Sequence, residues 1–419
     1  MTWKPIILLI MTLTSAYQML LHFIQYRSAS NPIPENVSDV YDAETHKRWM
    51  AYSGEKNRLL IFGSLLSWAI TFVLLCLNAH AAVAKLFPQN LYVQLMAVIA
   101  FQTLLESLLN MPLHYVDTMK IEEKYGFNRS TKKTFVIDQV RNLLIELVLG
   151  IALGALLCAL HQWLGDGMVL LFAACVFAIG LFISFLYPIL SRMSNKFAPL
   201  EEGELREKLS ALLTKHGYKV KAIEVMDASR RTTKSNAYFT GFGSLKTIVL
   251  YDNLVDAMTP DEICAVFAHE LGHGLNRDVL KMQLMNLGNM LLIALLAWLC
   301  VRTTGMHTAF GFDSVNYGFA YILLGCAFLA LLSPLTGLIT SAYSRRAEYR
   351  ADRQAVSEGY GQALITGLKK LAKGNFSHLS PSPLLVKLTY SHPPLSQRIA
   401  AIETAIMAQD GAAQADTQE

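Results

Sequence analysis

The hydrophobic residues of this chain fall into seven long runs separated by polar segments. Each run is long enough for a helix that crosses the hydrocarbon core of a bilayer, which takes about 20 apolar residues. We therefore predict an α-helical polytopic membrane protein with seven transmembrane helices. The first run has one basic residue ahead of it, Lys4, and no clean small-residue cleavage site, so we interpret it as a retained helix and not as a signal peptide. The predicted helices lie near 5–25, 59–79, 92–112, 143–163, 167–190, 283–303 and 318–341.

Lysine and arginine are concentrated in alternate polar segments. The segments 26–58, 113–142 and 191–282 and the region after the last run are rich in both residues, whereas the intervening loops contain only Lys85. The positive-inside rule then places the basic segments and the C-terminus in the cytoplasm and the N-terminus outside.

Five polar residues interrupt the predicted spans. A polar side chain that faces lipid is costly, so we expect these residues to face the protein interior. Two interpretations stay open: hydrogen bonds between packed helices, or a water-containing cavity. The residues are Gln102, Glu106, Glu146, Asn286 and Asn289.

Composition agrees with a membrane protein and excludes some other classes. The 419 residues are 53% hydrophobic and only 16% charged, against about 25% charged in soluble domains. The net charge of +4 is mild and does not indicate nucleic acid binding. The six cysteines form no CxxC pair, which argues against a disulfide framework or a cysteine-rich zinc site.

One segment has the pattern of a metal-binding helix. Thr259, followed by Pro260 and then Glu262, predicts a helix start with a capping box. On this helix His269 and His273 are four residues apart, so both imidazoles lie on one face and can bind one metal ion. Glu270 follows the first histidine. This is the HExxH pattern, in which zinc activates a water molecule and the glutamate is the general base; the alternative is an ordinary helix with two histidines.

A third ligand is predicted in the polar segment after the last hydrophobic run. Glu348 and Asp352 are four residues apart and share a helix face. Glu348 can complete a His2Glu site that leaves one position for water. Asp352 can then orient a ligand histidine through a hydrogen bond. The alternative is a charged helix with Glu–Arg pairs, because four arginines are close by in the sequence.

Two β-rich runs, 236–240 and 247–251, flank a glycine-containing turn just before the HExxH helix, which predicts a β-hairpin. An exposed strand edge can hold an extended peptide through main-chain hydrogen bonds. We expect the edge formed by Asn236, Ala237, Tyr238 and Phe239 to bind substrate in this way. The alternative is a hairpin that only packs its domain.

Several segments together resemble the type I CAAX prenyl endopeptidases, a family of integral-membrane zinc proteases. The resemblance covers most of the chain and implies that the helices enclose an intramembrane chamber, with the zinc site at its cytoplasmic side. The segments that carry it are Ile121–Asn128 with 131–138, Met226–Phe242, His269–His273, Ser344–Asp352 and Ser391–Arg398.

The same resemblance assigns roles to three further residues. It implies that His392 stabilises the oxyanion of the tetrahedral intermediate or binds the peptide, and that Arg398 supports that site. It also implies a hydrogen bond from the Asn236 side chain to the substrate backbone. From the residues alone, the rigid turn at His392-Pro393-Pro394 is compatible with a packing role.

We therefore expect a membrane zinc endopeptidase with one zinc ion per chain and an α+β catalytic domain of the zincin type in the cytoplasm. Its substrates are CAAX-type peptides, prenylated or not, or membrane-associated proteins. The alternatives are a quality-control protease without a CAAX role and a transporter with an incidental HExxH. The parts are five N-terminal helices (1–190), a catalytic segment (191–282), helices six and seven (283–341), a C-terminal catalytic region (342–408) and a tail whose Ala, Gln and Asp content predicts disorder (409–419).

Overall fold

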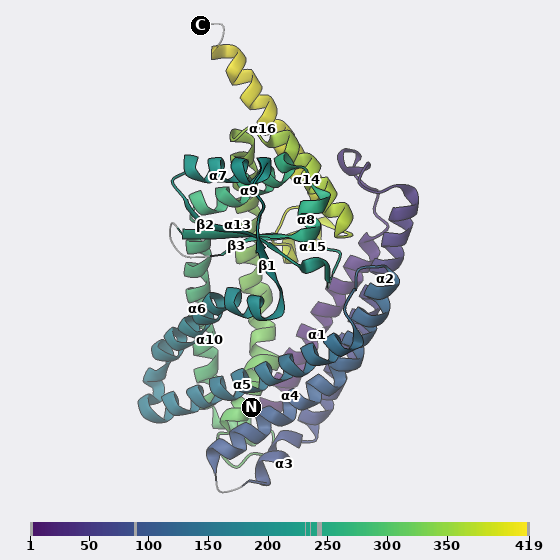
Figure 1. The fold of residues 1–419 in the computed structure, drawn as a ribbon. Coiled ribbons are helices and arrows are strands. Elements are labelled where there is room, and N and C mark those ends of the chain that lie inside the picture. The colour runs from purple at the N-terminus through teal and green to yellow at the C-terminus, as the bar shows by residue number, and fades with distance from the viewer. Residues whose placement is uncertain (1–2, 88–89, 231, 235, 241–244, 417–419) are drawn as a thin grey trace.

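The computed structural model describes residues 3–416 except 88–89, 231, 235 and 241–244. Long helices form the lower part of the molecule in Figure 1, and a small sheet with shorter helices forms the upper part. The long helices are α1 (Trp3–Ser28), α2 (Ala43–Cys76), α4 (Leu91–Val116), α5 (Lys132–Leu164), α6 (Met168–Ser194), α10 (Asp278–Arg302), and α12 (Tyr317–Leu323) continued through the π-helical turn η5 (Leu324–Leu329) into α13 (Ala330–Ser357).

Within the described residues, six helical stretches are long and apolar enough to cross a membrane. The stretch 132–184 contains α5 and most of α6, which are joined by the short turn η3 (Gly165–Gly167) and pack against each other. A multi-pass membrane protein is thus confirmed, and the count of seven crossings stays a prediction.

Three of the long helices, α2, α4 and α5, begin at residues whose side chains cap exposed backbone N–H groups. Asp42 accepts from the N–H of Thr45 at the start of α2, and Asn90 and Thr131 cap α4 and α5 in the same way. Short helices lie in the connections: η1 (Glu35–Val37), α3 (Ala79–Lys85), the π-helical turn η2 (Asp117–Glu122) and α11 (Thr304–Thr308).

A cavity of about 1010 Å³ lies among the long helices. Gln102, Glu106 and Glu146 line it, as expected for polar residues inside the spans, together with residues of α1, α2, α10 and the α12–η5–α13 helix. Both interpretations left open by the sequence apply to Gln102. Its side chain lines the cavity, and it also hydrogen bonds to His80 and Glu106.

The upper part is a four-stranded sheet packed on helices. The strands β1 (Phe197–Pro199), β2 (Lys219–Met226), β3 (Ala237–Thr240) and β4 (Leu245–Tyr251) are arranged in the order β1-β2-β4-β3. β3 and β4 pair antiparallel, which confirms the two strands of the predicted hairpin, and β3 is an edge strand. The predicted glycine-containing turn falls on residues 241–244, outside the described part of the chain. The helices are α7 (Glu204–Lys215), the single turn η4 (Ala228–Arg230), α8 (Asp252–Ala257), α9 (Pro260–Leu275), α14 (Gly361–Gly374), α15 (Pro383–Thr389) and α16 (Leu395–Asp416).

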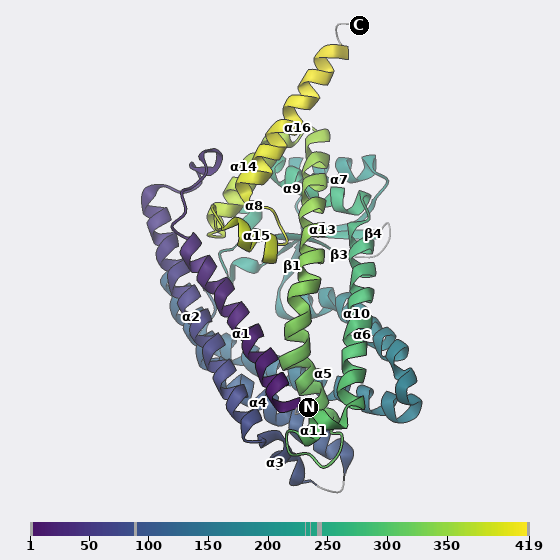
Figure 2. The same cartoon turned by 180° about the vertical axis from the view of Figure 1, so that it is seen from behind.

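The core of this part lies between the sheet and α9. Ile248 and Leu250 of β4 are fully buried against Ile263 and Phe267 of α9, with apolar residues of α7 and α14 around them. In both views the sheet lies between α9 and the membrane helix α5 (Figures 1 and 2). Helix α9 packs directly on α13 and contacts α10, and these two helices connect it to the membrane helices.

The end of the chain differs from the disordered tail expected from its composition. Helix α16 continues to Asp416 and projects from the rest of the molecule (Figure 2). Alanine and glutamine are good helix formers, so a helix that is already anchored by packing can extend through them. Residues 417–419 lie outside the described part of the chain.

Candidate active site

Helix α9 begins as its sequence predicts. The Thr259 side chain accepts from the N–H of Glu262, and the Glu262 carboxylate accepts from the N–H of Thr259 at 2.9 Å. Lys370 of α14 donates to the same carboxylate at 2.6 Å. Burial alone would raise the pKa of Glu262, but the bonds from Lys370 and Thr259 hold this pKa below its ordinary value. The start of α9 is thus fixed to α14.

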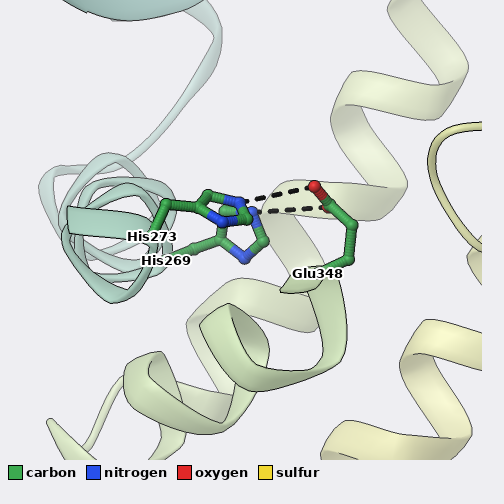
Figure 3. A group of neighbouring side chains, drawn as sticks. All are labelled: His269, His273 and Glu348. Atoms are coloured by element: carbon green, nitrogen blue, oxygen red, sulfur yellow. Dashed lines mark ion pairs between the residues drawn. The ribbon is translucent and has the colours of Figure 1, made fainter. Parts of the chain in front are cut away.

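Three side chains from two helices meet near the C-terminal end of α9. His269 and His273 extend from α9, and Glu348 of α13 extends toward them (Figure 3). The two Nε2 atoms lie 3.5 and 3.4 Å from the two carboxylate oxygens of Glu348. One ligand atom from each residue lies within 4.8 Å of the others, and no second such group occurs in the part of the chain that the structure describes.

These donors fit a zinc ion. Two imidazoles and one carboxylate are a common ligand set of catalytic zinc. Glu348 is only 3% exposed, and its Oε2 atom accepts no hydrogen bond from any described residue. Burial of a carboxylate oxygen that accepts no hydrogen bond is costly, and a bound cation would add to the compensation that the Arg398 guanidinium gives from 3.4 Å.

The two helices approach closely because Gly272 has no side chain. A Cβ atom at Gly272 would lie 2.8 Å from the Cα of Ala351 and 2.9 Å from the Cβ of Gln354, both on α13. Real Cβ atoms do not approach other atoms so closely. The glycine one residue before His273 therefore permits the contact that brings Glu348 to the histidines.

Each of the two histidines pairs through its Nδ1 atom with an aspartate carboxylate. Asp352, 1% exposed, lies with Oδ1 2.9 Å from Nδ1 of His269, as the spacing from Glu348 suggested. Asp278 lies with Oδ2 3.0 Å from Nδ1 of His273. Such bonds fix the ring and leave Nε2 free to bind a metal ion.

Asp278 is a partner of the site that the sequence pattern did not indicate. It is the first residue of α10, and it also accepts bonds from Tyr343 at 2.6 Å and Arg350 at 2.7 Å. The chain turns back between α9 and α10 through Arg277, whose φ of 54° is left-handed. The sequence does contain an aspartate five residues after the second histidine, and this could have suggested a partner for His273. Whether its side chain faces His273, however, depends on the turn at Arg277.

The Arg398 guanidinium contacts the carboxylates of Asp352 and Glu348. It donates to both oxygens of Asp352, from Nε at 3.0 Å and from Nη2 at 2.6 Å, and its Nη1 is 3.4 Å from Oε2 of Glu348. Burial lowers the pKa of Arg398, but Asp352 and Glu348 outweigh burial and raise it. The fixed charge of Arg398 therefore holds the two carboxylates in place.

His392 and Glu270 are more accessible. The His392 side chain is 64% exposed, and its Nδ1 lies 3.0 Å from Oε1 of Glu348. Glu270 is partly exposed beside the histidines. Burial lowers the pKa of His273, but Glu348, Asp278 and then Glu270 outweigh burial and raise this pKa to about 9. The arrangement thus has an accessible side with Glu270 and His392 and a buried side with Glu348, Asp352 and Arg398.

The predicted substrate edge lies on β3. The carbonyl of Asn236 accepts from the N–H of Tyr251, and the Asn236 side chain accepts from the N–H of Ala237 at 2.9 Å. Ala237, Tyr238 and Phe239 pair with β4 on one side only. The other side of β3 has no partner strand within the described residues.

The long helices and the two-helix histidine–glutamate group define a class, the membrane-embedded metallopeptidases. The chain belongs to peptidase family M48: the model of that family matches residues 199–406, and the model of the CAAX prenyl protease N-terminal domain, with five membrane helices, matches residues 22–192. The predicted family is thereby confirmed, and the protein is a metalloendopeptidase.

Similar proteins extend over nearly the whole chain. CAAX prenyl protease 1 of Saccharomyces cerevisiae is 31% identical, over 96% of this chain and 95% of its own length. The CAAX prenyl protease 1 homolog of Oryza sativa subsp. japonica is 30% identical, over 95% and 97%. The crystal structure of Ste24p of S. mikatae has a TM-score of 0.88 at 27% identity and covers 96% of this chain and 99% of that one.

Proposed function

We propose that the protein is a zinc endopeptidase that cleaves proteins with a C-terminal CAAX motif at the membrane. The observation that carries this proposal is the group of His269, His273 and Glu348, in a chain that matches CAAX prenyl proteases along nearly its full length. One zinc ion per chain fits the single group in the described residues. When bound, zinc would supply Lewis-acid polarisation of the scissile carbonyl.

The residues of the chain divide the remaining work. Glu270 is the general base that takes a proton from the attacking water and passes it to the leaving amine. His392 is exposed beside Glu348, so its ring can donate a hydrogen bond to the oxygen of the scissile carbonyl as negative charge develops there. Asp352 and Asp278 orient the ligand histidines, and Arg398 balances the buried negative charge.

The free edge of β3 positions the substrate. A peptide in extended conformation would add to the sheet beside Ala237 and Phe239, and main-chain bonds would fix its register whatever its sequence. Asn236, at the start of this edge, is exposed and can hydrogen bond to the peptide backbone.

The proposal includes the arrangement in the membrane. Seven crossings, formed by α1, α2, α4, α5, α6, α10 and the α12–η5–α13 helix, place the N-terminus outside and the zincin-type catalytic domain and the C-terminus in the cytoplasm. The alternation of basic and non-basic loops supports this orientation. The cavity of about 1010 Å³ among these helices supports the intramembrane chamber.

Separating the base from the ligands tests the catalytic assignment. Glu270→Gln should abolish hydrolysis and retain zinc, because the ligand atoms stay in place. Glu348→Ala should lose both zinc and activity. Metal content and peptide cleavage are measured on the purified proteins, and full zinc occupancy in Glu348→Ala would remove Glu348 from the ligand set.

Substrate class is tested by three substrates with the same enzyme preparation: a farnesylated CAAX peptide, its unmodified twin and an unfolded membrane protein without a CAAX motif. We expect cleavage of both peptides in preference to the unfolded protein. Preferential cleavage of the unfolded protein would contradict the CAAX proposal. Asn236→Ala should slow peptide cleavage without loss of zinc, whereas unchanged rates would leave Asn236 only a packing role.

A further inference from the structure

The segment Ile121–Asn128, between α4 and α5, takes no part in the chemistry described above. Its apolar side chains Ile121, Tyr125 and Phe127 are buried, and they form a cluster with Tyr52 of α2. The rings of Tyr125 and Phe127 both pack edge-on against Tyr52, at 5.1 and 5.3 Å between centroids. The segment is therefore packed against helix α2 through these aromatic contacts.

Glu122 of this segment collects three donors. Its Oε1 accepts from Tyr52 at 2.6 Å and from Lys56 at 2.9 Å, both on α2, and from Lys234 at 3.4 Å. The ammonium group of Lys234 also lies 5.1 Å from the centre of the Phe127 ring, within cation–π range. Lys234 thus has an anionic and an aromatic partner in one segment.

Lys234 belongs to the connection that leads into the edge strand β3. This connection is held along its backbone as well: Thr232 forms an antiparallel bridge with Asn128, and the N–H of Thr233 donates to the carbonyl of Phe127. From the other side, Asn253 of α8 donates to the carbonyl of Lys234 at 3.0 Å. Thr233 and Lys234 are therefore held against the segment Ile121–Asn128, and through it against α2.

We propose that Glu122 and Lys234 are positioning residues that set where the β3 edge lies relative to the zinc site, and thereby which peptide bond is cleaved. The proposal rests on the proposed function, in which substrate pairs with β3. Strand β3 is held by β4 on one side only, so the anchored connection at Lys234 adds a second constraint on its placement. A shift of one residue moves the substrate by about 3.3 Å and reverses which side chains face the enzyme.

The test compares Lys234→Ala and Lys234→Arg with the wild-type protein in detergent. Zinc content, melting temperature, kcat, KM and the cleavage position, by mass spectrometry, are measured on one CAAX peptide. Lys124→Ala is the matched control. Lys124 lies in the segment Ile121–Asn128, but its ion pair is with Glu55 of α2 and does not involve the connection into β3. We expect Lys234→Ala to keep zinc, to raise KM roughly two- to five-fold and to yield products cut at neighbouring bonds. Lys234→Arg should restore the single cut, and the control should match the wild type.

A single cut and an unchanged KM in Lys234→Ala would overturn the proposal, and so would a loss of zinc with no change of cleavage position. Glu122→Gln is the second variant and should give the same mixed products. Failure of the wild-type protein to cleave the peptide would refute the proposed function instead, so the two failures are distinguishable.

Discussion

Asp352→Ala removes the carboxylate that touches both His269 and Arg398. The His269 ring loses its acceptor at 2.9 Å, and Arg398 loses two bonds, at 3.0 and 2.6 Å. Loss of such a histidine partner weakens metal binding by roughly 10–100-fold, which is about 1.4–2.7 kcal/mol. Removing one member of a buried ion pair costs a further ~3–5 kcal/mol of folding stability. We expect a value near the lower end of this range, because Arg398 still has the Glu348 carboxylate as an anionic partner.

Zinc affinity is measured by competition with a chelator, and stability by thermal unfolding of the zinc-loaded protein. Asp352→Asn should fall between the wild type and Asp352→Ala, because its amide oxygen can still accept from His269 while the charge opposite Arg398 is lost. Asp39→Ala is the control, since this exposed aspartate pairs with Lys369 on α14. Zinc affinity in Asp352→Ala equal to that of the wild type would refute the role given to this carboxylate.

Three further predictions concern other parts of the molecule. Arg345 donates to the carbonyls of Val386 and Tyr390, just before His392; Arg345→Ala should therefore lower kcat with zinc retained, and an unchanged kcat would contradict this. Because folding lowers the pKa of Glu262, its carboxylate stabilises the protein fully above pH about 4.5, and this stabilisation is lost as the pH falls through the lower folded-state pKa. The difference in melting temperature between wild type and Glu262→Gln should therefore shrink in acid. Reporters placed in 304–317 and after the C-terminus should report opposite sides of the membrane, and a common side would refute seven crossings.

Local sequence patterns predicted much of this molecule. The capping box, the histidine spacing and the β3–β4 hairpin each depend on residues close together in the chain, and the structure contains all three. Glu348 and Asp352 could be selected because a charged pair at helical spacing followed a hydrophobic run.

The remaining features depend on contacts that spacing does not encode. Asp278 faces His273 only because the chain turns at Arg277. Arg345 was one of several arginines in a charged helix, and its acceptors lie in α15 and directly after it, in a separate part of the chain. The helical end of α16 follows from an anchored helix, whereas composition alone favoured disorder.

The close contact at Gly272 also limits how the enzyme can move. Because backbone and Cβ atoms of α13 lie where a side chain would otherwise be, α9 cannot slide or rotate on α13 without a clash. We therefore expect the two helices that carry His269, His273 and Glu348 to move together. Opening of the site for a peptide to enter, or for products to leave, has to come from parts outside this pair, such as the exposed loop of His392. The rate of product release would then depend on those parts and not on the ligand helices.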